Sequence, residues 1–98
     1  MELSERLMNI VELVTPGHIV ADVGCDHGYV SIYLVREGIA PRAIAMDVGT
    51  GPLMRAKEHI AEAGLTAYIE TRLSDGVHEL KSGEADGLIL AGMGGSLM

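Results

Sequence analysis

The sequence predicts an α/β fold, namely the first half of a doubly wound parallel sheet with about four strands and a preceding N-terminal helix. Two observations support this prediction. Short apolar runs of strand length alternate four times with segments of helical length along the 98 residues, and continuous apolar runs are typical of parallel strands buried on both faces. Glycines follow these runs, which indicates tight connections between strands and helices.

The predicted elements follow one another in a regular order. Apolar residues at helical spacing indicate the first helix, with Ser4 as its cap and Pro16-Gly17 beyond its end. Gly38 closes the second helix, and Pro52 stands in the first turn of the third. In chain order we expect a helix over 3–14, a strand over 18–23, a helix over 29–37, a strand over 43–46, a helix over 51–63, a strand over 67–71, a short helix over 77–81 and a strand over 87–90.

The composition is that of a globular, cytoplasmic protein. Hydrophobic residues make up 48% of the chain and charged residues 21%. No apolar run approaches the roughly 20 residues of a membrane span, and the N-terminus lacks a signal-peptide pattern, so no membrane partner is expected. A net charge of −7 and only three tyrosines as aromatic residues are poorly suited to holding a nucleic acid unaided.

The end of the chain suggests a truncated domain over residues 1–98. The sequence stops at Met98, where a helix after the fourth strand should begin. The fourth strand then has no partner on its far side, and its residues Leu88, Ile89 and Leu90 are apolar. Because an unpaired apolar edge is a template for pairing with another chain, we expect self-association through this edge.

The turn after the first strand, from Asp22 to Tyr29, carries the clearest ligand signal. Its glycines Gly24 and Gly28 permit close approach of a ligand, and the next helix offers unpaired amides. The spacing does not match G-x-G-x-x-G, which argues against a NAD-dependent oxidoreductase. It matches the acid-x-Gly-x-Gly-x-Gly turn of S-adenosylmethionine-dependent methyltransferases, with Asp26 in place of the middle glycine. The alternative is a tight turn with a capping aspartate and no ligand.

Two further acidic turns follow the second and third strands. Asp47, beside Val48, lies 23 positions after Gly24, where an acid accepts hydrogen bonds from ribose hydroxyls. Ser74-Asp75-Gly76 follows the third strand, and Asp75 is a candidate for the adenine amine. Each acid could equally cap the turn or helix after it. Taken together, three acidic turns at successive strand ends favour an adenosyl cofactor. Gly92, after the fourth strand, would let the backbone approach the base or the methyl donor.

No metal site is expected. Cys25, Asp26 and His27 are adjacent in sequence and cannot easily converge on one ion, and a single cysteine excludes a zinc site built on cysteine pairs. His27 and Tyr29 are placed near the reactive end of the cofactor, where each would contact the target base or merely pack beneath the turn. Three histidines are expected to be ordinary and partly exposed, namely His18, His59 and His78.

The sequence resembles the bacterial tRNA adenine-N1 methyltransferases that modify adenine 22. The resemblance spans nearly the whole chain in the family's order, and the combination of Asp-His-Gly-Tyr with Ala-Gly-Met-Gly-Gly is its most specific part. The matching segments are Leu3-Ser4, Arg6-Leu7, 21–29, 38–40, Asp47, Gly51-Pro52, 72–76 and 91–95.

The resemblance implies a Rossmann-like methyltransferase fold that binds S-adenosylmethionine and acts on tRNA. It places the methyl donor in the glycine turn, Asp47 and Asp75 on the adenosine, and Asp26, His27 and Tyr29 near the transfer site. It also implies further strands and a C-terminal domain that help to grip tRNA, so the 98 residues alone are expected to be inactive. The alternatives are an adenosyl-nucleotide-binding module without catalysis and another small-molecule methyltransferase.

Overall fold

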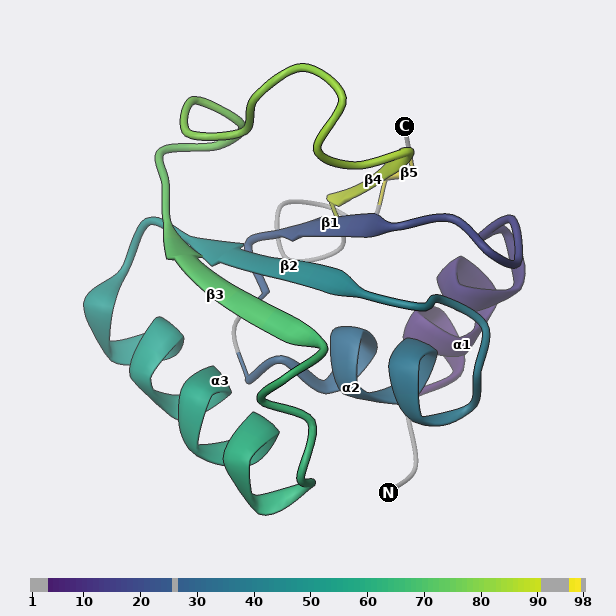
Figure 1. The fold of residues 1–98 in the computed structure, drawn as a ribbon, viewed down its shortest axis with the longest axis horizontal. Helices are drawn as coiled ribbons and strands as arrows, with labels where there is room; N and C mark the ends of the chain where they lie inside the picture. The colour runs from purple at the N-terminus through teal and green to yellow at the C-terminus, as the bar shows by residue number, and fades with distance from the viewer. Residues whose placement is uncertain (1–3, 26, 91–95, 98) are drawn as a thin grey trace.

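The computed structural model describes residues 4–25, 27–90 and 96–97, and these form one sheet covered by three helices (Figure 1). The strand order within this described part is β3-β2-β1-β4-β5, in which the first four strands are parallel and β5 is antiparallel to β4. The elements are α1 (Glu5–Glu12), β1 (Val20–Val23), α2 (Tyr29–Arg36), β2 (Ala43–Asp47), α3 (Thr50–Glu62), β3 (Ile69–Leu73), β4 (Gly87–Leu90) and β5 (Ser96–Leu97). The predicted fold class is confirmed.

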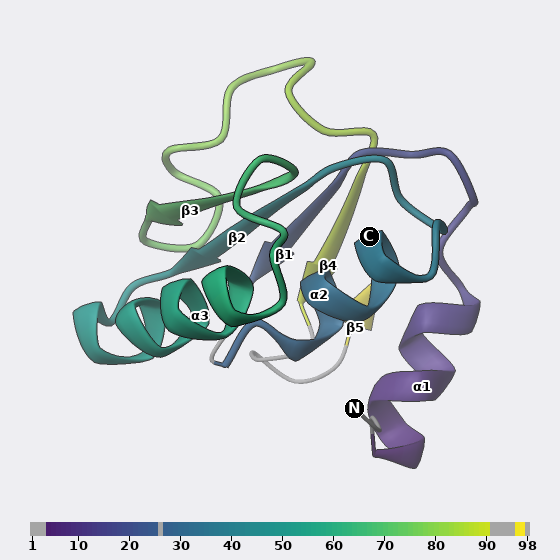
Figure 2. The same cartoon turned by 60° about the horizontal axis from the view of Figure 1, so that its bottom comes forward.

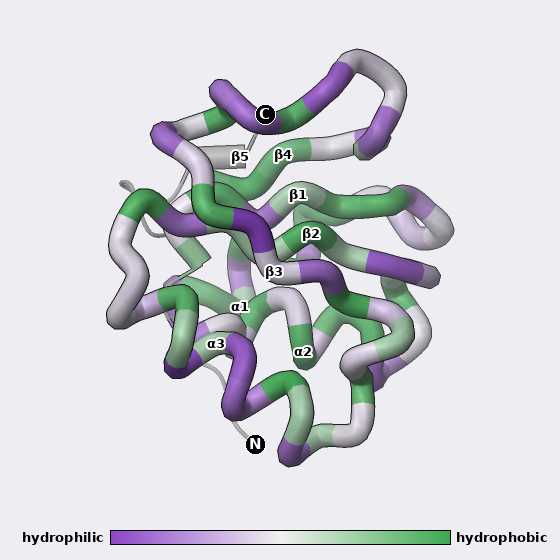
Figure 3. Tube along the Cα trace, turned by 60° about the vertical axis from the view of Figure 1, so that its left-hand side comes forward, coloured by the Kyte–Doolittle hydropathy of each residue, from purple (hydrophilic) through white to green (hydrophobic). Residues whose placement is uncertain are grey.

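The helices cover one face of the sheet, and the connection between β3 and β4 crosses the other (Figures 1 and 2). Alternate residues of β2 contribute to apolar clusters on the two faces of the sheet: Ala43 and Ala45 pack toward the helices, whereas Ile44 and Met46 face the connection. On that second face the connection contributes Leu80. Figure 3 shows the apolar stretches concentrated along the central strands, between more hydrophilic outer segments.

β1 is the central strand and fixes the rest of the sheet. All four of its residues are buried, as expected for a parallel strand with neighbours on both sides. Val20 pairs with Ala43 of β2 and with Gly87 of β4, so the three strands begin at the same level. The strand predicted over 18–23 therefore begins two residues later, because Ile19 instead bonds to Asp86 at the start of β4.

The three long predicted helices are confirmed, each with ends within two residues of those expected: α1 covers Glu5–Glu12 and α2 covers Tyr29–Arg36. Ser4 caps α1 by accepting a hydrogen bond from the Leu7 amide at 3.3 Å, and the third helix begins at Thr50, one residue before the predicted start.

The strand predicted over 67–71 lies two residues later along the chain, over Ile69–Leu73. Its backbone register is set by β2, which pairs Ala43 with Ile69 and Asp47 with Leu73.

The short helix predicted over 77–81 is wrong, because this segment forms turns. The Ser74 hydroxyl accepts the Glu79 amide at 3.1 Å and donates to the Gly76 carbonyl at 2.8 Å. Local side-chain bonds of this kind compete with helix formation.

The prediction that β4 lacks a partner on its far side is also wrong. Ile89 pairs with Leu97 and Leu90 with Ser96, so β5 occupies part of that edge. An apolar strand edge carries unsatisfied backbone groups, and here a later segment of the same chain satisfies some of them. Self-association through the remaining edge stays a prediction.

Among the residues that the structure describes, no helix is long and apolar enough to cross a membrane.

A single arginine ties the β3–β4 connection to the sheet. The Arg72 guanidinium donates to both carboxylate oxygens of Glu84, at 2.7 and 2.9 Å, and to the Glu79 carbonyl at 3.0 Å. Its Nε donates to Glu70 at 2.8 Å. Arg72 thus joins three points of the chain, and bidentate pairs of this type are the strong ones.

The Glu84→Gln variant should loosen this connection. Arg72 lowers the pKa of the Glu84 carboxyl from 4.5 to about 2, so the ionised pair favours the folded state above pH 4.5 and loses that effect as the pH falls toward 2. We expect faster amide exchange across residues 75–86 at pH 7 and a weaker acid dependence of unfolding. Glu62→Gln, at an exposed position of α3, is the control. Equal exchange in the two variants would contradict this role of Arg72.

Candidate cofactor-binding site

The three acidic turns predicted from the sequence emerge at one edge of the sheet. The strands are parallel and in register, with Val23 beside Met46 and Met46 beside Arg72. The segments that follow β1, β2 and β3 therefore begin next to one another, at the carboxyl ends where ligands bind in open α/β sheets. The structure confirms this juxtaposition.

The turn after β1 is built from backbone bonds and glycines. Cys25 donates its amide to the Met46 carbonyl, which prolongs the β1–β2 pairing, and Gly28 donates to the Cys25 carbonyl; both distances are 2.8 Å. Gly24 and Gly28 have φ values of +72° and +76°, a region that L residues with a side chain rarely adopt. Gly28 is also the N-cap of α2, and its carbonyl accepts the Ile32 amide at 3.0 Å.

Asp22 lies beneath this turn and holds α2 to β1. Its side chain is 2% exposed and accepts a hydrogen bond from the Ser31 hydroxyl at 2.9 Å, and from the Ser31 amide as well. Burial raises the pKa of the Asp22 carboxyl from 3.8 to about 6, and the nearby charge of Asp47 adds to the rise. An anion at the N-terminal turn of α2 also suits the helix dipole. The motif's first acid therefore organises the turn; direct contact of Asp22 with a cofactor stays a prediction.

Asp47 caps the turn that follows β2. Its Oδ1 accepts the Gly49 amide and its carbonyl accepts the Ser74 amide, each at 2.9 Å. The capping alternative raised from the sequence is thus present in the structure. Asp47 is half-buried at the carboxyl end of β2 and Val48 beside it is 69% exposed, so both are accessible from this edge. A contact of Asp47 with ribose stays a prediction.

Ser74 shapes the third turn. It is 4% exposed, and its hydroxyl is engaged with Gly76 and Glu79. Asp75 is exposed at the tip, and the alternative that it caps a helix at Val77 fails because no helix forms there. The predictions for Asp26 and Gly92 concern residues outside the described part of the chain.

His27 and Tyr29 form a cluster of rings with His59, which the sequence did not single out. The ring centroids of Tyr29 and His59 are 5.0 Å apart, those of His27 and Tyr29 5.2 Å, and those of His27 and His59 5.5 Å. His59 Nδ1 also lies 2.8 Å from the His27 carbonyl oxygen. No local pattern could reveal His59, because its contacts cross 32 residues of sequence.

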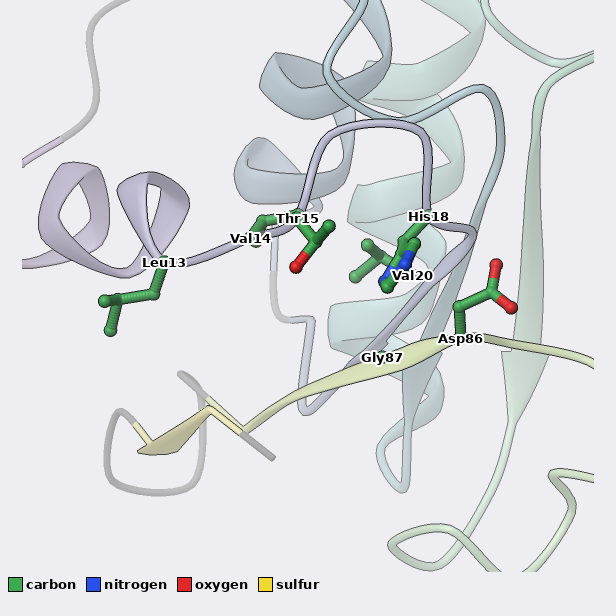
Figure 4. A pocket seen from close by; sticks show the side chains of 7 residues that line it. All are labelled: Leu13, Val14, Thr15, His18, Val20, Asp86 and Gly87. Atoms are coloured by element: carbon green, nitrogen blue, oxygen red, sulfur yellow. The ribbon is translucent and has the colours of Figure 1, made fainter.

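A pocket at the opposite edge of the sheet is not part of this site. It has a volume of about 170 Å³ and is lined by the end of α1, the segment before β1 and the start of β4 (Figure 4). These are the amino ends of the parallel strands, away from the acidic turns. Its lining residues are Leu13, Val14, Thr15, His18, Val20, Asp86 and Gly87. The described residues contain no group of three metal-capable side chains placed to hold an ion.

Comparison with known proteins identifies close relatives. A family model described as a methyltransferase domain matches residues 3–98. The tRNA (adenine(22)-N(1))-methyltransferase of Bacillus subtilis (strain 168) is 40% identical over 98 residues, which is 100% of this chain and 41% of that protein. This chain therefore spans about two fifths of the length of that curated relative.

Solved structures agree with the sequence comparison. The crystal structure of the B. subtilis M1A22 tRNA methyltransferase TrmK matches with a TM-score of 0.86 and 38% identity, covering 89% of this chain and 37% of that one. M. capricolum TrmK, in complex with the natural cofactor product S-adenosyl-homocysteine, matches with a TM-score of 0.80 and 37% identity, covering 86% of this chain and 37% of that one.

Replacing Asp22 with asparagine should remove a pH dependence of stability. Because the folded state raises the pKa of this carboxyl to about 6, its ionisation disfavours folding, and the wild type loses stability as the pH rises from about 4 to 6. Between pH 4 and pH 8 the variant should gain about 2–3 kcal/mol in free energy of unfolding relative to wild type. Urea titrations at both pH values measure this. Asp75→Asn, at an exposed carboxylate, is the control, and parallel pH profiles for wild type and Asp22→Asn would refute the assignment.

Proposed function

Because the chain belongs to the methyltransferase-domain family, we propose that it is the cofactor-binding part of an enzyme that methylates N1 of an adenine in tRNA with S-adenosylmethionine. The observation that carries this proposal is the 40% identity over the full 98 residues to the B. subtilis tRNA (adenine(22)-N(1))-methyltransferase. The match spans the whole chain, so it covers the segments that hold the three acidic turns of the candidate site.

The residues present fit this cofactor. S-adenosylmethionine carries an ammonium group and a sulfonium, both cationic, and at the site edge the charge of Asp47 is near enough to add to the rise in the pKa of Asp22. Two glycines with positive φ let the turn backbone lie close to a ligand. We assign cofactor contacts to Asp22, Gly24, Asp26, Gly28, Asp47, Val48, Ser74, Asp75, Gly76 and Gly92.

The chain's residues have to bind and orient the reactants rather than move a proton. Bound S-adenosylmethionine supplies an electrophilic methyl group on a sulfonium, whose loss leaves a neutral thioether. Adenine N1 carries a lone pair, so the reaction does not require a strong general base. Positioning and exclusion of water account for much of the acceleration in such a case. We assign Asp26, His27 and Tyr29 to orienting groups at the transfer site.

The tRNA-gripping surface belongs to the remainder of the natural protein in this proposal. A chain with seven basic and fourteen acidic residues repels a phosphate backbone. This chain spans 41% of its relative's length, which leaves room for a basic surface elsewhere. A tRNA substrate also supports a cytoplasmic location.

The full-length natural protein should transfer a methyl group to unmodified tRNA, and the 98 residues alone should not. The assay follows tritium from labelled S-adenosylmethionine into tRNA, and reverse-transcription stops map the modified adenine. Transfer to protein or to small amines instead would refute the tRNA assignment. Cofactor binding without any transfer would support a binding module without catalysis, and robust transfer by the 98 residues would refute the need for the remainder.

Asp47→Asn should weaken cofactor binding while preserving the turn, because asparagine keeps an oxygen that accepts the Gly49 amide. A hydrogen bond to a charged group contributes about 1.5–3 kcal/mol, so we expect roughly ten- to hundredfold weaker binding of S-adenosylhomocysteine by calorimetry. Asp86→Asn, which makes the same change at the amino end of β4, should bind normally. Unchanged affinity in Asp47→Asn would rule out the ribose contact.

A further inference from the structure

We propose that His59 is a positioning residue for the cofactor-binding turn, which it fixes by donating a hydrogen bond from Nδ1–H to the backbone carbonyl of His27. This inference rests on the proposed function and extends it to a residue of α3. Neither the sequence motifs nor the acidic turns include His59.

The geometry determines which atom donates. A backbone carbonyl oxygen can only accept, so the 2.8 Å contact requires the proton to be on Nδ1 of His59. The bond joins the last turn of α3 to the peptide that directly precedes Gly28. It therefore acts on the backbone of the turn and does not depend on which side chain position 27 carries.

Ring packing adds a second restraint on the same segment. The His59 ring lies 5.0 Å from the Tyr29 ring and 5.5 Å from the His27 ring, with interplanar angles of 21° and 29°. Offset stacking at such distances is favourable. His59 thus contacts the residues on both sides of Gly28, where the turn ends and α2 begins.

Close packing one helical turn earlier makes α3 a support for the turn. Ala56 is fully buried, and a Cβ added to Gly28 would lie 3.1 Å from the Ala56 Cβ. Ala56 and His59 are three residues apart, so they face the same side of the helix. The turn therefore contacts α3 at two points. Gly28 packs so closely on Ala56 that a side chain at position 28 would not fit without a shift, and the His27 carbonyl accepts the His59 hydrogen bond.

The same helix also connects two parts of the candidate site. α3 begins at Thr50, directly after the Asp47–Gly49 turn at the end of β2. A shift of α3 would move the β1 turn and the β2 turn together. His59 accordingly helps to set the distance between the start of α2 and the segment that carries Asp47.

Paired substitutions separate this role from simple packing. In His59→Asn the side-chain amide nitrogen occupies the place of Nδ1, whereas in His59→Gln it reaches the place of Nε2; both variants lack the ring. In the full natural chain we expect His59→Asn to bind S-adenosylhomocysteine within about threefold of wild type and His59→Gln to bind roughly tenfold more weakly. Amide exchange at residues 27–30 should be faster in His59→Gln than in His59→Asn. The melting temperatures of the two variants should be equal.

His18→Phe is a control at a histidine on the opposite edge, and it should bind like wild type. Equal binding and equal exchange in His59→Asn and His59→Gln would overturn the inference, and so would weaker binding that only follows a lower melting temperature. If wild type itself fails to bind S-adenosylhomocysteine, the proposed function is overturned instead.

Discussion

The buried contact between Asp22 and Ser31 is the constraint on which the site depends. A carboxylate in the central strand is removed from water, and the hydroxyl and amide of Ser31, in the first turn of α2, offset part of that loss. Because β1 pairs with strands on both sides, this contact fixes the direction in which the chain leaves the sheet. The glycine turn lies between the two ends of that contact. Its shape follows from the requirement that Ser31 reach Asp22.

The acidic edge is a product of strand register as much as of sequence. Asp47 lies in the sequence 25 residues after Asp22, yet the parallel pairing of β1 and β2 brings the two charges near enough for one to raise the pKa of the other. The Ser74 amide bonds to the Asp47 carbonyl and adds the third turn to the same edge. A cationic ligand would relieve the repulsion that this arrangement creates.

Local signals predicted the parts of the fold that local chemistry decides. The cap at Ser4 and the glycine after α2 need only neighbouring residues, and both are found where expected. The helix predicted after Ser74 does not form because the Ser74 hydroxyl and the Arg72 guanidinium bond to the Glu79 backbone there. The role of His59 could not be predicted, since it depends on a partner 32 residues away that only the folded chain brings close.

The two faces of the sheet are covered by different kinds of structure: helices pack on one face, and the turn-rich β3–β4 connection packs on the other. On the helical face, α1 and α2 contribute to one apolar cluster and α2 and α3 to another, so loss of α2 would expose core residues of both other helices. On the opposite face, Ala21, Val23, Ile44 and Met46 are shielded in part by a turn-rich segment through Leu80 and Ala85. That segment is held to the sheet by these two apolar side chains and by the hydrogen bonds of Arg72 and Ser74. Because Ser74 to Gly76 belong to it, the third turn of the acidic edge is supported by hydrogen bonds, whereas the first two turns are supported by packed helices.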